Sequence, residues 1–413
     1  MNKENINTII VDDSKSIIVV LDAILAQLGV EKVAHCGTGI EALAMINAKP
    51  NHYQLLFIDL NMPEMDGMEL IRHLGGQGFS GSIVIISGME IRVINLASEV
   101  ARQNKVHLLG NIVKPIKVDE LQHILTKFHY LNDHLSIIQT PLSKEELELA
   151  ISEQRILPYY QPKIDSNSNE VHSIEVLARI DNPGQGDSIL PIRFIQCAEE
   201  NDLIDELTFQ LLTKAIKDYK EMRESFGNLL TLAFNLSPIQ LNDLEIPNKL
   251  AALFSQNDIS PKQIVIEVTE EWALQSTNQL ETLNRLRMKG YGVSLDDFGT
   301  GFTNVTQLKS LPFSEIKIDR SFITDIHHDY FSQVIVNTLI DITQKYDYEL
   351  VAEGVESHDE YEYLKSLNTR MLLQGYLISK PKPKDELIRW FHNWKKMSEA
   401  EACEEATISD KKK

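Results

Sequence analysis

The sequence contains few cysteines, and none of them forms a close pair. Cys36, Cys197 and Cys403 are spread over 413 residues and make no CxxC motif. Such isolated cysteines favour free thiols in a reducing cytosol.

Long apolar segments are also missing. No stretch is long and uncharged enough to cross a bilayer, and the first ten residues, MNKENINTII, lack the basic segment and apolar core of a signal peptide. We therefore expect a cytoplasmic protein that does not bind a membrane.

Positive charge is scarce. The chain has 40 Lys and Arg against 60 Asp and Glu, a formal net charge of −20. Because phosphates need basic partners, we do not expect direct DNA binding. An acidic protein can still process a phosphate substrate where metal ions locally invert the charge.

The alternation of apolar runs and amphipathic stretches divides the chain in two. Residues 1–128 predict a doubly wound α/β domain with a five-stranded parallel, flavodoxin-like sheet, and residues 129–144 predict a linker. Eight strand-like runs over 145–395 predict a (β/α)8 barrel. Its first connection, IDSNSNEV, is too short for a crossover helix, so we expect one antiparallel strand. The charged tail, 396–413, is expected to be a frayed helix or disordered.

Polar side chains follow several strands of the first domain. In an open α/β sheet the ligand crevice lies at the carboxyl ends of the strands, so these side chains should meet there. Three acids suit Mg²⁺, and a hydroxyl and an ammonium could contact a phosphoryl group. Any one of them alone is better explained as an ordinary strand-end residue, but the full set is not. The set is Asp12, Asp13, Asp59, Ser87 and Lys114.

With DLNMPEMDG around the third acid, this region resembles the receiver domain of bacterial response regulators over essentially its whole length. The resemblance implies that a cognate histidine kinase phosphorylates Asp59. It also implies one Mg²⁺ on Asp12 or Asp13, Asp59 and the carbonyl of Asn61, with Ser87 and Lys114 against the phosphoryl group.

In the second domain, polar residues recur at the late ends of the strands, where such barrels build their active sites. Five acids and an amide at one mouth would repel one another unless cations neutralise them. Because no His or Cys shares these positions, the donors indicate Mg²⁺ or Mn²⁺ rather than zinc. The residues are Gln161, Glu175, Asn235, Glu267, Asp296, Asp297, Lys317, Glu353 and Gln374.

Two adjacent aspartates end one apolar run, in VSLDDFGTGF. Neighbouring strand residues normally point to opposite faces. Gly299 and Gly301 permit a bend that lets both Asp296 and Asp297 reach the mouth, with Asp296 able to bridge two metals. Two metals roughly 3.5–4 Å apart suit in-line attack on a phosphodiester. Taken singly, each acid is better explained as a solvated or salt-bridged loop residue.

Residues 145–395 resemble an EAL-type cyclic-di-GMP phosphodiesterase in the stretches YQP, EVLAR, FNLS, EVTE, DDFGTGF, KIDRSF, EGVES and QGYLISKP. The resemblance implies two-metal hydrolysis of c-di-GMP to linear pGpG, under control of the receiver, by at least a homodimer. The resemblance implies that one metal is bound by Glu175, Asn235, Glu267 and Asp296, and a second by Asp296 and Asp297. Lys317 would position or activate the attacking water, and Glu353 would support the cluster of metals and water. Substrate would be held by Gln161, Leu177, Arg179 and Gln374, and Glu270 would anchor the loop after Asp297.

Three positions depart from these family patterns. Asn111 occupies the place of the receiver's usual aromatic switch residue, which leaves open how the signal exits. Val176 replaces the alanine of the EAL triplet, and its methyl groups should contact barrel packing rather than metal. The stretch IDNP after Arg179 lacks the usual aromatic and histidine. An alternative function is therefore a catalytically weak c-di-GMP-binding sensor or interaction module.

Overall fold

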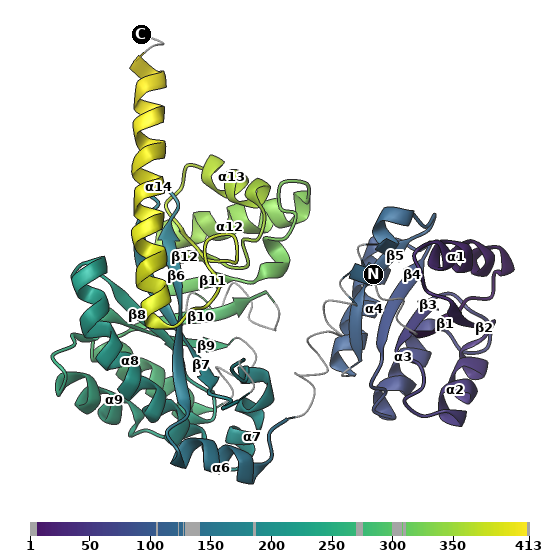
Figure 1. Cartoon of the computed structure of the whole chain (residues 1–413), viewed down its shortest axis with the longest axis horizontal. Helices are drawn as coiled ribbons and strands as arrows, with labels where there is room; N and C mark the ends of the chain where they lie inside the picture. Colours follow the sequence, from purple (N-terminus) through teal and green to yellow (C-terminus); the bar gives the residue numbers. More distant parts are fainter. Residues whose placement is uncertain are drawn as a thin grey trace. The chain divides into compact units, whose positions relative to one another are not determined.

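The computed structural model describes residues 6–104, 106–122, 124–126, 128, 141–184, 187–269, 276–299, 308 and 311–410, with the backbone alone for 398–410 and some other helical positions. The chain forms two compact units, residues 1–139 and 140–413 (Figure 1).

The first unit is a five-stranded parallel sheet in the order β2-β1-β3-β4-β5, which confirms the predicted flavodoxin-like fold. Its elements in chain order are β1 (Asn7–Val11), α1 (Lys15–Gln27), β2 (Lys32–Cys36), α2 (Gly39–Ala48), β3 (Leu55–Asp59), α3 (Gly67–Gly76), β4 (Ser82–Ser87), α4 (Ile91–Gln103) and β5 (His107–Val113).

The sheet of this unit is buried on both faces, as a parallel sheet with helices on each side must be. Ile9 and Leu56 belong to the core on one face, whereas Ile10 and Phe57 belong to the core on the other. This explains why the strands read as continuous apolar runs in the sequence. Because both faces are covered, the strand ends are where a ligand is expected to reach the sheet.

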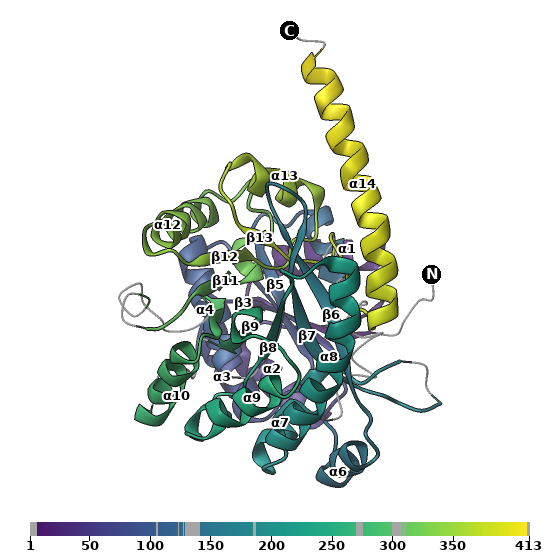
Figure 2. The same ribbon diagram turned by 90° about the vertical axis from the view of Figure 1, so that its left-hand side faces the viewer.

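The second unit is a closed barrel in the order β10-β11-β12-β13-β6-β7-β8-β9, with helices around it (Figures 1 and 2). Its elements are α6 (Lys144–Ser152), β6 (Ile156–Asp165), β7 (Val171–Ile180), α7 (Ile195–Glu200), α8 (Ile204–Phe226), β8 (Thr231–Asn235), α9 (Ile246–Ser255), β9 (Ile264–Thr269), α10 (Thr277–Met288), β10 (Gly292–Phe298), β11 (Glu315–Ile318), α12 (Tyr330–Tyr346), β12 (Glu349–Ala352), α13 (His358–Ser366), β13 (Leu372–Leu373) and α14 (Lys384–Asp410).

One strand of the barrel, β6, runs against both of its neighbours, so the predicted antiparallel hairpin is confirmed. It places Gln161 beside Glu175 and Lys163 beside Ser173. Val176, next to Glu175, is 3% exposed within the hydrophobic core, as expected of the opposite strand face. Alternation thus directs Glu175 into the barrel and Val176 into the apolar layer outside it.

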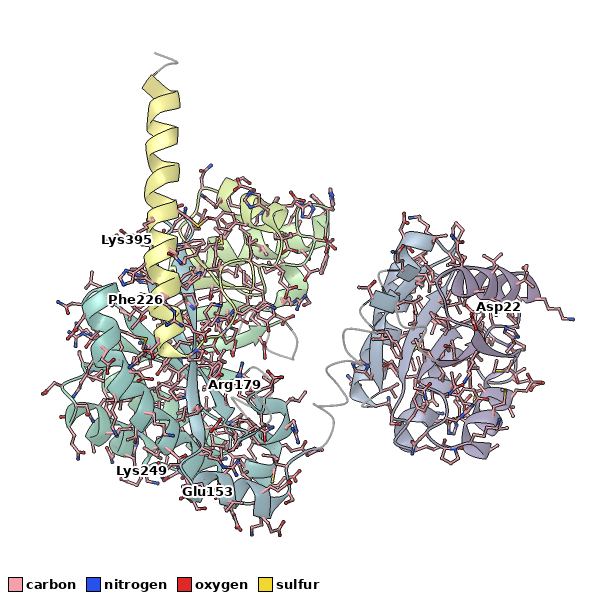
Figure 3. All side chains as sticks on the ribbon, in the orientation of Figure 1. Asp22, Glu153, Arg179, Phe226, Lys249 and Lys395 are labelled. Carbon is pink, nitrogen blue, oxygen red and sulfur yellow. The ribbon has the colours of Figure 1, made fainter. Side chains whose placement is uncertain are left out.

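The end of the chain is helical. Helix α14 is anchored to the barrel by two indole groups: Trp390 donates to the carbonyl of Ile378 at 3.1 Å, and Trp394 donates to that of Asn169 at 2.8 Å. Phe226 of α8, labelled in Figure 3, stacks on Phe391 with the ring centroids 4.0 Å apart. The helix continues past residue 396, so of the two expectations for the tail the helical one holds as far as Asp410.

Cys36 and Cys197 are free, in agreement with the isolated cysteines of the sequence, and the Cys403 side chain lies outside the described part. Among the described residues, no helix combines the length and the apolarity needed to span a membrane.

The close approach of α3 to β3 yields a stability prediction. A Cβ at Gly67, the first residue of α3, would lie 2.3 Å from the backbone oxygen of Asp59, whereas one at Gly76 in the same helix would meet nothing within 4 Å. We expect Gly67→Ala to destabilise the first unit by about 1–3 kcal/mol through overpacking. Denaturant unfolding of the full chain measures this.

Gly76→Ala is the matched control, because it adds the same methyl group in open space. It should be neutral or stabilising by up to about 1 kcal/mol, since Ala favours helix over Gly. Equal effects of the two substitutions would show that the contact at the end of β3 is not a constraint.

Candidate functional site

The ammonium of Lys317 is the centre of the barrel mouth. Its Nζ lies 2.7 Å from Glu353 Oε1, 2.8 Å from Asp296 Oδ1, 3.3 Å from Glu267 Oε2 and 3.9 Å from Glu175 Oε2. Four carboxylates carried by four different strands or strand ends therefore meet one cation, and the lysine side chain is 2% exposed. Because these strands all belong to one closed barrel, residues far apart in sequence converge on one point.

Amide side chains join the same group. Asn235 Nδ2 lies 3.0 Å from Glu175 Oε1 and 3.4 Å from Glu267 Oε2. On the other side, Gln374 Nε2 donates to Glu175 Oε2 at 2.6 Å and lies 3.3 Å from Gln161 Oε1. Glu175 is thus held by hydrogen bonds from two directions, and the amides connect it to the neighbouring strands.

The adjacent aspartates reach the same mouth because β10 is distorted at its end. The register between β10 and β11 shifts between Leu295 and Phe298, and Asp297 adopts a left-handed backbone with φ of 57°. Carboxylate atoms of Asp296, Asp297 and Glu353 all lie within 4.8 Å of one another. The bend therefore starts at Asp297 itself; Gly299 is also left-handed, and Gly301 is outside the described residues.

Two buried charged residues that the sequence did not predict, Lys163 and Glu315, lie in the barrel below the mouth. Lys163 Nζ lies 2.7 Å from Glu267 Oε1 and 3.1 Å from Glu315 Oε1, and both its side chain and that of Glu267 are 0% exposed. The strand period carries a signal for them, since Lys163 follows Gln161 by two positions, as Glu315 precedes Lys317 by two.

Burial and the neighbouring lysines shift the pKa values of these carboxyl groups in opposite directions. Burial raises the pKa of Glu175 to about 7, and the neighbouring charge of Glu267 adds to the effect. Burial would raise the pKa of Glu267 too, but the ammonium groups of Lys163 and Lys317 outweigh it and hold this pKa at about 2. Burial likewise raises the pKa of Glu353 well above its usual value.

The remaining predicted residues of the barrel are placed differently. Leu177 lines a cavity together with Asn235 and Asp297. The guanidinium of Arg179, labelled in Figure 3, lies over the Tyr159 ring, 5.5 Å from its centroid, and donates to the carbonyl of Ala178 at 2.8 Å. Glu270 lies outside the described residues.

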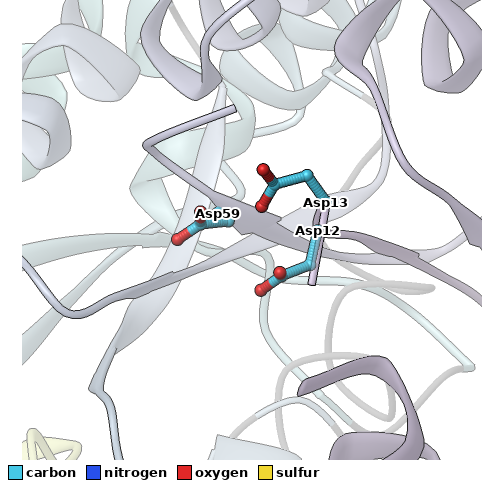
Figure 4. A group of neighbouring side chains, drawn as sticks. All are labelled: Asp12, Asp13 and Asp59. Atoms are coloured by element: carbon cyan, nitrogen blue, oxygen red, sulfur yellow. The ribbon is translucent and has the colours of Figure 1, made fainter. Parts of the chain in front are cut away.

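The acidic group of the first unit is assembled at the ends of β1 and β3. Carboxylate atoms of Asp12, Asp13 and Asp59 lie within 4.8 Å of one another (Figure 4). Lys114 Nζ donates to Asp12 Oδ2 at 2.7 Å and to Asp59 Oδ1 at 3.0 Å. Burial raises the pKa of Asp59, against the opposing effect of Lys114. Four of the five predicted polar residues are therefore in one cluster.

The other receiver positions flank this cluster. The backbone N–H of Asn61 hydrogen-bonds to Asp59. The buried hydroxyl of Ser87 accepts from the N–H of Met89 at 3.2 Å. Asn111 Oδ1 lies 3.2 Å from Ser98 Oγ of α4, so a polar contact between α4 and β5 stands where the family has an aromatic ring.

Comparison with known proteins identifies both units. The EAL domain model matches residues 144–381, more than half of the chain, and the response regulator receiver domain model matches residues 8–126. The chain belongs to the EAL domain family, and its EAL domain follows a receiver domain.

Among its relatives, the cyclic di-GMP phosphodiesterase RocR of Pseudomonas aeruginosa is 26% identical over 389 residues, which are 93% of this chain and 98% of RocR. The cyclic di-GMP phosphodiesterase PdeR of Escherichia coli is 33% identical over 60% of this chain and 37% of PdeR. A solved structure of the PaMucR phosphodiesterase in its c-di-GMP complex matches with a TM-score of 0.55 and 31% identity, over 59% of this chain and 98% of that one. The chain thus spans nearly all of RocR but less than half of PdeR.

The opposite pKa shifts at the mouth predict opposite effects of neutralising each glutamate in the metal-free chain. Glu175 keeps a proton in the fold up to about pH 7, so its contribution to stability falls as pH rises from the unfolded value near 4.5 to about 7. Glu175→Gln should therefore stabilise the barrel relative to wild type by at least about 1 kcal/mol at pH 8, and by less at pH 5. Chemical unfolding with chelator at both pH values measures this.

Glu267→Gln is the control. Its native carboxylate has a pKa of about 2, so its stabilising contribution is complete at both pH 5 and pH 8 and is lost only below the unfolded value. This variant should be destabilised about equally at the two pH values. A stability difference for Glu175→Gln that does not change with pH would contradict the assignment.

Proposed function

We propose that this protein hydrolyses c-di-GMP to pGpG at the mouth of its barrel, under control of its receiver domain. The observation that carries this proposal is the meeting of four carboxylates on the single ammonium of Lys317. The names of RocR, PdeR and PaMucR, which are phosphodiesterases, support the reaction and substrate class.

The donors at the mouth fit hard divalent cations. Carboxylate and amide oxygens from Glu175, Asn235, Glu267 and Asp296 form one candidate set, and Asp296 with Asp297 forms a second. Such oxygen donors suit Mg²⁺ or Mn²⁺. When bound, these ions would supply a water of lowered pKa and stabilise charge on the phosphate. The excess of carboxylates over ammonium groups gives the cations a physical reason to bind.

Lys317 acts as a hydrogen-bond donor in this proposal. Burial would lower the pKa of its ammonium, but the surrounding carboxylates raise it well above its usual value. The group therefore stays protonated and holds a hydrogen bond to the attacking water instead of removing its proton. Glu353, 2.7 Å away, fixes the direction of this ammonium.

Substrate contacts come from the rim. The Oε1 atom of Gln374 is buried and has no hydrogen-bond partner among the described residues, so it can accept from the dinucleotide. Gln161 is fixed beside it through the carbonyl of Ser379 at 3.0 Å. Arg179 supplies a guanidinium for phosphate, and Leu177 supplies an apolar wall.

The receiver supplies the control. Asp59 is the proposed phosphoacceptor, with one divalent cation on the neighbouring acids, and a histidine kinase is the proposed source of the phosphoryl group. Lys114 contacts Asp59 Oδ1 at 3.0 Å, and phosphorylation would let the ammonium exchange this contact for one with the phosphoryl group. This exchange is the local change that could bias the rest of the domain.

The first test is c-di-GMP hydrolysis with Mg²⁺ or Mn²⁺, followed as pGpG. Glu175→Gln replaces a carboxylate that is a proposed metal ligand. It should lower kcat/KM by at least about 100-fold, which is the scale of losing a group that stabilises transition-state charge. Glu362→Gln, which neutralises an exposed glutamate on α13, should match wild type. Binding of c-di-GMP by wild type without any pGpG would leave the sensor function instead.

A second test concerns control. Beryllofluoride or acetyl phosphate should change the wild-type rate of pGpG formation, and Asp59→Asn should abolish that change while retaining basal turnover. Asp22→Asn, on the exposed side of α1, is the control and should respond as wild type does. A response that survives in Asp59→Asn would place the regulatory input elsewhere.

A further inference from the structure

A second charged layer lies in the barrel interior, one strand repeat below the mouth. Lys163 extends from the antiparallel strand β6, and Glu315 extends from β11. Ser294, whose neighbours in register are Glu267 and Glu315, lies on β10 in the same layer. Lys163 is 0% and Glu315 is 3% exposed, so this layer is closed to solvent.

Lys163 contacts the mouth through the carboxylate of Glu267. Its Nζ lies 2.7 Å from Glu267 Oε1, whereas the other oxygen of the same group, Oε2, lies 3.3 Å from Lys317 and 3.4 Å from Asn235. The two oxygens of Glu267 are thus divided between the layers. One faces down to Lys163, and the other joins the residues of the mouth.

Stability alone gives a weak reason for this arrangement. A buried ammonium is costly unless it is fully paired, and well-packed apolar side chains are often as stabilising as a buried ion pair. Removing one partner is different, because it leaves an uncompensated charge. Lys163 has two carboxylate partners, Glu267 at 2.7 Å and Glu315 at 3.1 Å, so it stays paired when Glu315 alone is neutralised.

We propose that Lys163 is a positioning residue for metal binding at the mouth. It holds the lower oxygen of Glu267 and so presents the upper oxygen in a fixed orientation to the cation. The inference deepens the proposed hydrolase function and rests on it for the reaction. Hydrogen-bonded partners of metal-ligating groups have this effect in general, and losing them typically costs 10–100-fold in metal affinity or activity.

The test compares two full-length variants that differ at Lys163. Glu315→Gln keeps the contact between Lys163 and Glu267. Lys163→Met combined with Glu315→Gln removes that contact without leaving the charge of Glu315 unpaired. Mn²⁺ binding without nucleotide is measured by the electron paramagnetic resonance of free Mn²⁺. A chain with Glu267→Ala and Asp296→Ala measures the contribution of the receiver, which is subtracted.

The double variant should bind Mn²⁺ at the barrel at least about 10-fold more weakly than Glu315→Gln, at a similar melting temperature. Glu315→Gln should bind as wild type does. Equal Mn²⁺ affinities of these two variants would overturn the proposal. If the Met variant does not fold, Lys163→Gln with Glu315→Gln keeps a polar side chain there and carries the same expectation and the same refutation.

Mn²⁺ binding also separates this inference from the proposed function. If wild type makes no pGpG but the double variant binds Mn²⁺ more weakly as expected, the hydrolase function is refuted and the positioning role is supported. Turnover with no loss of affinity would refute the positioning role alone.

Discussion

Repulsion among carboxylates is the constraint on which the barrel depends. Burying several acids at one mouth is unfavourable unless each finds a positive or hydrogen-bonding partner. The fold meets this demand with ammonium groups from two strands, Lys317 within the mouth and Lys163 beneath it, and with the amides of Asn235 and Gln374. The compensation is incomplete, since four carboxylates surround Lys317. In the metal-free chain burial raises the pKa of Glu175 and Glu353, so protons offset part of this charge; divalent cations would take the place of those protons and suit the site to a phosphate substrate.

The antiparallel strand β6 gives this arrangement its depth. Reversal of one strand places Gln161 at the mouth and Lys163 and Asp165 successively lower, so a single strand contributes a polar group to each layer of the interior. Asp165 is the last of these residues and forms an ion pair with Arg370, with Nε 2.9 Å from Oδ2. The interior of this barrel is therefore polar along the height of β6, unlike the branched apolar layers that fill many barrels of this class.

Much of this could be predicted from the sequence because strand alternation and strand ends are local signals. The spacing of apolar runs predicted the receiver sheet, the barrel and its reversed strand. Alternation along the strand predicted that Val176 faces away from Glu175. What could not be predicted depends on contacts between distant strands. The pairing of Lys163 with Glu315 joins positions 152 residues apart, and the left-handed backbone at Asp297 depends on the register shift beside β11. The polar contact of Asn111 with Ser98 likewise required α4 to be placed against β5.

The buried pair of Lys163 and Glu315 also constrains how this sequence can diverge. Loss of Lys163 alone leaves the charge of Glu315 without this partner in a closed interior, which is strongly destabilising, whereas loss of Glu315 alone leaves Lys163 paired with Glu267. Two simultaneous changes to apolar residues avoid that intermediate but leave Glu267 without its lower partner. The two positions are thus expected to drift together, and a lineage that has lost both would need another way to orient the glutamate above them.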